Sequence, residues 1–255
     1  MMAEGAWDAQ AEALRAFSVL TSLRPATMDG GWPGALILAI GLGTRGAVVS
    51  TAGNIAGAAC LAIDPRAEAC RAALLSGACD FVVNTVDEAL RILKNQIRQR
   101  RPVSVALEAT PDAAVGELLD RGLLPELLTE QRSNGPGDEP GVLSPATRTR
   151  ALQSLAPLGT LIVDFDGSFA GAAGIVDASA ALESATRERG LKLESFNFAN
   201  GEELRAFDER LQAMIPVDDA RHRWCVAAPR FFHRERPHRR VVYLTAAETA
   251  TLRQP

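Results

Sequence analysis

The chain has 255 residues, of which 47% are hydrophobic, and its 27 basic and 31 acidic side chains give a formal net charge of −4. This length suits one large α/β domain or two small ones, and the acidic balance provides no basic surface for a nucleic acid. The N-terminus does not have the pattern of a signal peptide, and no apolar run reaches the roughly 20 residues of a membrane span. We therefore expect a cytoplasmic protein that binds neither nucleic acid nor membrane.

Short apolar runs alternate with helical patterns along the chain. An amphipathic helix at about 7–18 comes first, and strands are then predicted at 35–40, 58–63, 103–107, 126–129, 160–165, 191–196 and 240–244. Helices are predicted at 65–76, 86–100, 112–121, 146–155, 177–189 and 202–214. Most strands are apolar throughout, which is typical of strands covered on both faces. The order predicts an α/β fold with a mainly parallel sheet and helices on both faces, and we interpret residues 1–255 as a single domain.

Three glycines follow the first predicted strand directly, in the stretch ALILAIGLGTRGAVVS. Gly41 permits a tight turn, Gly43 allows a diphosphate to approach the backbone, and Gly46 lets the next helix pack closely. The following strand ends at Asp64, whose carboxylate can accept hydrogen bonds from a ribose diol. Arg45 either contacts a phosphate or is a solvated cation. The pattern predicts a dinucleotide site, and a glycine turn kept for packing is the alternative.

Other polar groups have structural interpretations. The segment 131–145 is rich in Gly and Pro, follows a strand, and is either part of the site or a surface loop. Asp218 and Asp219 before His222 are interpreted as the start of a helix rather than as a general-base cluster. Asp164 and Asp166 are interpreted as a strand-end turn rather than as a metal site. We expect the basic segment 230–240 to be a solvated connector.

The cysteines show no CxxC pair, and we expect them to be small buried hydrophobic residues rather than disulfide partners or metal ligands. They are Cys60, Cys70, Cys79 and Cys225. No activated nucleophile is spaced to partner the histidine of the 218–224 segment, so the sequence indicates no catalytic set and no metal site.

The stretch ALILAIGLGTRGAVVSTAGNIAGAACLAID resembles the dinucleotide-binding core of urocanase, or urocanate hydratase. The resemblance continues in order through TVDEALRILKNQIRQRRPVSVALEATPDAAVGELLDRGLLPELLTEQRS, LGTLIVDFDGSFAGAAGI and IPVDDARHRWCVAAPRFFHRERPHRRVVYL. It covers roughly residues 6–247. It implies a Rossmann-like domain.

The resemblance also implies a cofactor and its ligands. Urocanases are lyases of histidine catabolism in which NAD acts as an electrophile toward the imidazole ring of urocanate, without redox work. By position, the resemblance assigns the diphosphate to the loop of Gly41, Gly43, Thr44 and Gly46, a ribose to Asp64, and the nicotinamide half to Thr110, Gln131 and Ser133. The resemblance also implies a homodimer, the assembly expected for this family.

The sequence departs from the family pattern at several cofactor-side positions. The family has Gly at the position of Thr44, Gln at that of Val49 and Pro at that of Ser50. It has Asn at the position of Thr110, Thr at that of Arg132 and His at that of Gly135. The family segments that form the urocanate pocket and the one that carries the active-site cysteine have no counterpart here. Two hypotheses follow: a dinucleotide-binding protein that is one part of a split urocanate hydratase with a complementary chain, or a non-catalytic remnant or regulatory small-molecule module.

Overall fold

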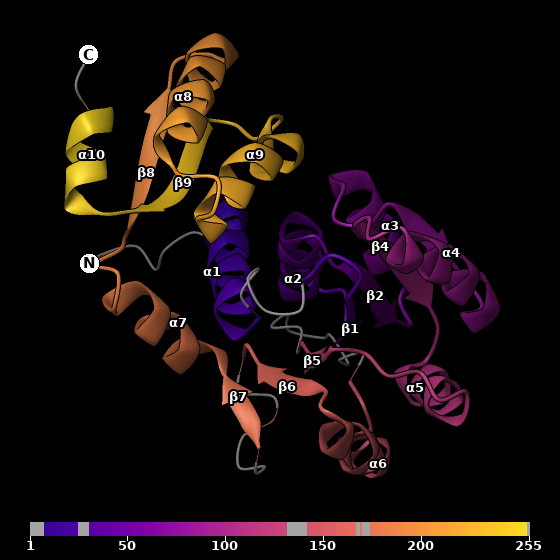
Figure 1. Cartoon of the computed structure of the whole chain (residues 1–255). Coiled ribbons are helices and arrows are strands. Elements are labelled where there is room, and N and C mark those ends of the chain that lie inside the picture. Colours follow the sequence, from indigo (N-terminus) through magenta and orange to yellow (C-terminus); the bar gives the residue numbers. More distant parts are fainter. Residues whose placement is uncertain (1–7, 25–30, 132–141, 167–168, 170–173, 254–255) are drawn as a thin grey trace, which may run out of the picture.

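The computed structural model describes residues 8–24, 31–131, 142–166, 169 and 174–253. Its main sheet contains β1 (Leu36–Ile40), β2 (Ala59–Asp64), β3 (Phe81–Val83), β4 (Val103–Glu108), β5 (Leu127–Glu130), β6 (Leu161–Asp164) and β7 (Ile175–Asp177). The order is β3-β4-β2-β1-β5-β6-β7, and every neighbouring pair is parallel. The predicted parallel sheet is confirmed (Figure 1).

The central strands β1 and β2 are buried along their whole length. In β1, Ile37 belongs to the core on one side of the sheet, while Leu36 and Leu38 belong to the core on the other side. Full burial of each such side chain contributes about 1.5–3 kcal/mol. Apolar residues at successive positions therefore stabilise a strand with helices on both faces.

Helices cover both faces of the sheet. On one side lie α1 (Ala9–Leu23), α2 (Thr44–Ala56), α3 (Ala67–Ser76) and α7 (Ala178–Arg187), and on the other side α4 (Val86–Arg98), α5 (Pro111–Asp120) and α6 (Pro145–Leu155), followed by a 3-10 turn at Ala156–Leu158. Asp8 begins α1 by accepting a hydrogen bond from the Ala11 N–H at 3.0 Å. This side-chain cap satisfies a helix N–H that has no intrahelical partner.

The C-terminal part forms a second, two-stranded sheet. The C-terminal part contains β8 (Lys192–Phe198), α8 (Gly201–Met214), α9 (Ala220–Phe232), β9 (His238–Leu244) and α10 (Ala246–Leu252). The sheet consists of β8 and β9, which pair antiparallel. The last two predicted strands therefore exist but do not join the parallel sheet. In β8, Phe196 and Phe198 contact Phe207 of α8, with ring centroids 4.7 and 5.0 Å apart. Their exposed neighbours alternate with them, as in a strand covered on one face.

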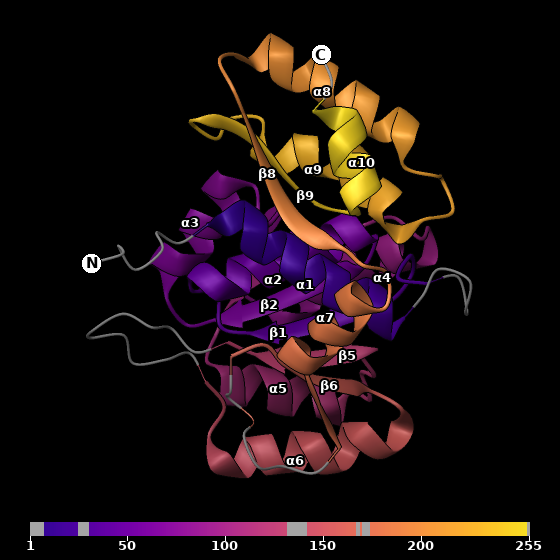
Figure 2. The same ribbon diagram turned by 90° about the vertical axis from the view of Figure 1, so that its left-hand side faces the viewer.

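This C-terminal part packs on α1 and α2 (Figures 1 and 2). Trp224 is completely buried, lies 5.6 Å from the Phe17 ring of α1, and donates from Nε1 to the Val241 carbonyl at 3.0 Å. Arg223 donates from Nε to the Ile55 carbonyl, near the end of α2, at 3.0 Å. These contacts hold the segment around His222 against α1 and α2. The single-domain interpretation of residues 1–255 stays a prediction.

Asp219 begins α9 by accepting from the Arg221 N–H at 2.9 Å, as its position before the helix predicted. The Arg221 guanidinium bridges Asp219 and Glu248, with N–O distances of 2.7 Å to each carboxylate. Burial alone raises the pKa of Asp219, but hydrogen bonds from Arg221 and Arg189 outweigh it and lower that pKa from 3.8 to about 2. Asp219 therefore stabilises the fold in its ionised form.

This lowered pKa predicts acid sensitivity. Asp219 has a lower pKa in the folded than in the unfolded chain, so its contribution is present above the unfolded value and is lost as the pH falls through the folded value. Asp219→Asn keeps the helix cap but removes the charge. We expect urea unfolding to show a less stable variant at about pH 6 and nearly equal stabilities at about pH 2. A stability difference that does not change between these pH values would contradict this explanation.

Several elements differ from their predicted bounds. The first helix runs from 9 to 23 rather than from about 7 to 18, and the short β3, β7 and α10 were not predicted. Both strands have only three residues, too few to show a pattern. In the described part of the chain no helix is long and apolar enough to cross a membrane. The cytoplasmic location stays a prediction.

Candidate functional site

The candidate site lies where β1 adjoins β2 on one side and β5 on the other. At the carboxyl end of β1, the Gly41 N–H donates to the Ile63 carbonyl of β2 and the Gln131 N–H donates to the Ile40 carbonyl, both at 2.8 Å. The chain leaves β1 toward β2 and later returns to β5, so the connections diverge here. Open α/β sheets bind ligands in the crevice at such a point.

The glycine loop connects β1 to α2 with two positions that only glycine fits. Gly41 has φ +89°, a left-handed conformation. A Cβ on Gly46 would lie 1.9 Å from the Gly41 carbonyl oxygen. Gly43 begins α2 without any side-chain cap, so the first N–H groups of the helix and the positive end of its dipole face the loop. Thr44 is the first residue of this helix, and its side chain lies outside the described part.

Asp64 ends β2 and is completely buried beside the loop. Its Oδ2 accepts from the Leu42 N–H at 2.6 Å and from Arg66 Nη2 at 2.9 Å. Its Oδ1 accepts from Arg66 N–H at 2.9 Å and from Arg66 Nε at 3.0 Å. The carboxylate therefore connects the glycine loop to the start of α3.

Of the three positions expected at the nicotinamide half, the two that the structure describes do not lie together. Gln131 follows β5 next to the glycine loop, is buried, and donates from Nε2 to Thr129 Oγ1 at 3.0 Å. Thr110 follows β4, which β2 separates from β1, and its exposed side chain makes no cap for α5. Ser133 lies outside the described residues, as do Arg132 and Gly135. The strand order thus puts Thr110 and Gln131 on opposite flanks of the loop.

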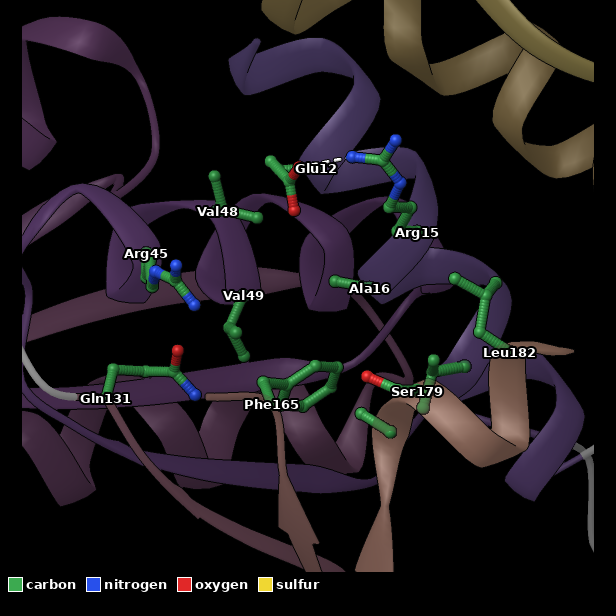
Figure 3. Close-up of a pocket in the computed structure, with 12 residues that line it drawn as sticks. Glu12, Arg15, Ala16, Arg45, Val48, Val49, Gln131, Phe165, Ser179 and Leu182 are labelled. Atoms are coloured by element: carbon green, nitrogen blue, oxygen red, sulfur yellow. Dashed lines mark hydrogen bonds and ion pairs between the residues drawn. The ribbon is translucent and has the colours of Figure 1, made fainter. Parts of the chain in front are cut away.

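A pocket of about 110 Å³ lies on the Gln131 side of the loop (Figure 3). Three helices, α1, α2 and α7, and the residues that follow β5 and β6 line it: Glu12, Arg15, Ala16, Val19, Arg45, Val48, Val49, Gln131, Phe165, Ala178, Ser179 and Leu182. In Figure 3 Arg45 and Gln131 lie on one side of the pocket, the Glu12–Arg15 ion pair lies above, and Phe165 lies below, between Gln131 and Ser179. The lining therefore combines apolar side chains with charged and polar ones.

The comparison with known families agrees with this geometry. Residues 16–136 match the family described as Urocanase Rossmann-like domain. The matched range contains β1 to β5 and the whole glycine loop. The resemblance stated from the sequence is confirmed for this range, and its extension to about residue 247 stays a prediction.

Solved structures of dehydrogenases are similar to parts of this chain. Benzyl alcohol dehydrogenase from Acinetobacter calcoaceticus is 15% identical, with a TM-score of 0.34, and the match covers 72% of this chain and 41% of that chain. The NAD complex of D-isomer specific 2-hydroxyacid dehydrogenase from Lactobacillus delbrueckii ssp. bulgaricus is 13% identical, with a TM-score of 0.30, and the match covers 72% of this chain and 46% of that chain. Galactitol-1-phosphate dehydrogenase from Escherichia coli is 14% identical, with a TM-score of 0.31, and the match covers 95% of this chain and 62% of that chain. The chain thus spans less than two thirds of the length of each.

Most of the pocket was not predictable from the sequence. Glu12 and Arg15 come from α1, and Ser179 and Leu182 come from α7, on either side of the urocanase-like core. No motif marks these residues, and they reach the pocket only because α1 packs against both α2 and α7. The one signal is the amphipathic pattern of the first helix, which predicts a packed face without naming its neighbours.

Glu130, at the end of β5, was also missed. It is completely buried and accepts from Arg148 Nε at 2.8 Å and Nη2 at 2.9 Å, and from the Leu143 N–H at 2.8 Å. The hydrogen bond to Glu130 raises the pKa of Arg148, and burial lowers that pKa by less, so the net shift is upward. This ion pair joins the end of β5 to α6.

The alternative metal and thiol sites have structural explanations. Asp164 accepts from the Asp166 N–H at 3.2 Å and the Phe169 N–H at 3.1 Å, which is the strand-end turn that was predicted. Within the described residues no group of three His, Cys, Asp or Glu could hold a metal. All four cysteines are buried and unpaired, as predicted, and burial raises the pKa of the Cys60 and Cys225 thiols to about 12. These thiols are therefore protonated and unreactive at neutral pH.

Proposed function

We propose that this chain binds a dinucleotide of the NAD type at the loop between β1 and α2. The observation that carries the proposal is the loop itself, where Gly41 turns with positive φ and Gly46 packs on its carbonyl. The start of α2 is left without a side-chain cap at Gly43. Such a helix start offers N–H donors and a positive dipole to a diphosphate. The urocanase match over residues 16–136 supports the same site.

The residues around the loop suit different parts of the cofactor to different degrees. The diphosphate end fits, because the uncapped helix start lies directly behind the loop. The cofactor-binding set is proposed to be Gly41, Gly43, Thr44, Gly46, Thr110, Gln131 and Ser133, and Asp64 supports the loop by accepting from the Leu42 N–H. Gln131 and Phe165 both line the pocket, and the Phe165 ring offers an apolar surface to a flat ring. When bound, the nicotinamide would supply the electrophile, while this chain would position it.

For the activity, we propose that the chain is one part of a split urocanate hydratase and that a complementary chain completes the substrate pocket. The competing proposal is a non-catalytic small-molecule module. The cysteines favour the second, because none of the four is exposed or has a lowered pKa. Urocanate turnover upon mixing with a complementary urocanase-like chain would support the first. Light scattering of the pure protein would test the proposed homodimer.

Calorimetry tests the proposed nucleotide site directly. We expect NAD to bind, and ADP-ribose to bind about as tightly, because phosphate contacts carry most of the affinity. Gly43→Val should abolish binding of both, since a branched side chain fills the space that the diphosphate needs. The thermal stability of the Gly43→Val variant should fall only modestly. Failure of both nucleotides to bind at millimolar concentration, about −4 kcal/mol or weaker, would disprove the site.

A further inference from the structure

The carboxylate that a dinucleotide-binding fold offers to the adenosine ribose is already saturated in this chain. An ionised carboxylate has about four lone-pair sites. In Asp64 four N–H groups occupy them, one from the Leu42 backbone and three from Arg66, at 2.6 to 3.0 Å. The side chain is also completely buried. A ribose diol would have to donate both hydroxyl groups to oxygens that have no acceptor site left.

Arg66 brings a positive charge to the place where this diol would lie. It follows β2 by two residues, begins α3, and its side chain remains 25% exposed while that of Asp64 is inaccessible. The Leu42 hydrogen bond ties this ion pair to the glycine loop, so the guanidinium lies at the same edge of the sheet as the loop. A guanidinium has a planar set of donors that matches the oxygens of a phosphate.

We propose that Arg66 makes the site selective for a dinucleotide that carries a phosphate on its adenosine ribose, as NADP does. This inference rests on the proposed function, and it names the form of the nucleotide. A 2′-phosphate accepts hydrogen bonds and needs none of the acceptor sites that Asp64 has lost. The Asp64 charge is compensated by Arg66 in a two-point ion pair, which reduces its repulsion of the phosphate.

One nearby acidic residue opposes this binding. Glu108 at the end of β4 is in register with Asp64 and is only partly buried. Its negative charge weakens the attraction of a phosphate to this corner of the site. Glu108→Gln should therefore tighten NADP binding and leave NAD binding nearly unchanged.

The experiment compares four nucleotides by calorimetry on the wild-type protein: NADP, NAD, 2′,5′-ADP and 5′-ADP. We expect NADP to bind at least about tenfold more tightly than NAD, and 2′,5′-ADP at least about tenfold more tightly than 5′-ADP. This is the range of a charge-assisted hydrogen bond to the 2′-phosphate. Arg66→Ala should remove this preference and strengthen NAD binding, because Asp64 regains acceptor sites. Arg71→Ala is the matched control, since it removes the same charge from an exposed position of the same helix.

The outcomes separate this inference from the proposed function. If NAD binds as tightly as NADP or more tightly, the selectivity is disproved and the dinucleotide site stands. If none of the four nucleotides binds, both are disproved. Arg66→Ala leaves a buried carboxylate without its cation, so its folding is checked by circular dichroism. Arg66→Lys keeps the charge without the planar set of donors and should retain only part of the preference, whereas full retention would contradict the phosphate contact.

Discussion

Gly46→Ala is expected to lower the free energy of unfolding by about 3 kcal/mol and to abolish nucleotide binding. The new Cβ would lie 1.9 Å from the Gly41 carbonyl oxygen and 2.8 Å from its carbon, both backbone atoms. Gly41 cannot retreat easily, because its N–H is bonded to the Ile63 carbonyl at 2.8 Å and its φ is already +89°. The start of α2 must therefore move away from the loop, and the N–H groups that face a diphosphate move with it.

Urea unfolding and calorimetry with NAD and NADP measure both effects of Gly46→Ala. The matched control is Gly116→Ala, in the middle of α5, where the nearest atom to the new Cβ is a side-chain nitrogen at 3.8 Å. Alanine there should be neutral or should stabilise by up to about 1 kcal/mol, because glycine is a poor helix former. Wild-type stability and affinity in the Gly46 variant would show that the loop does not approach the helix this closely.

Asp208→Ala is expected to cost about 3–5 kcal/mol of stability, the usual effect of removing one partner from a buried ion pair. Arg240 of β9 is completely buried, contrary to the solvated connector expected for 230–240, and donates to Asp208 of α8 from Nε at 2.7 Å and from Nη2 at 2.8 Å. Gln10 of α1 joins the pair, since its Oε1 accepts from Arg240 Nη1 at 3.4 Å and from the Val241 N–H at 2.6 Å. The variant leaves a guanidinium inside the protein without a counter-charge.

Thermal and urea unfolding of Asp208→Ala should be compared with Asp120→Ala, which removes an exposed aspartate paired with Arg150. This control should change the stability by less than about 1 kcal/mol. Replacing both buried partners, with Asp208→Leu and Arg240→Met, should restore most of the stability, because no charge is then buried. An equal loss of stability in Asp208→Ala and Asp120→Ala would disprove a special contribution of the buried pair.

Much of the candidate site could be predicted because its signals are local. The order of glycines after an apolar strand requires a tight turn and a close helix, and the conformations of Gly41 and Gly46 have both features. The saturation of Asp64 was not predicted, although Arg66 is only two residues away. Spacing shows that two charges are near, but not whether a carboxylate faces a ligand or its own neighbour. That choice depends on the side-chain conformation beside the Leu42 N–H.

The sequence by itself determined the parallel sheet, because a short strand that is apolar at successive positions, such as β1, is stable only with helices on both faces. It also determined the start of α9 at Asp219, since a capping side chain bonds to the helix within two residues. The tertiary structure decided that β8 and β9 form a separate antiparallel sheet and that α1 brings Glu12 and Arg15 to the pocket. Such pairings join residues far apart in the chain, and periodicity shows that a face is buried without showing what buries it.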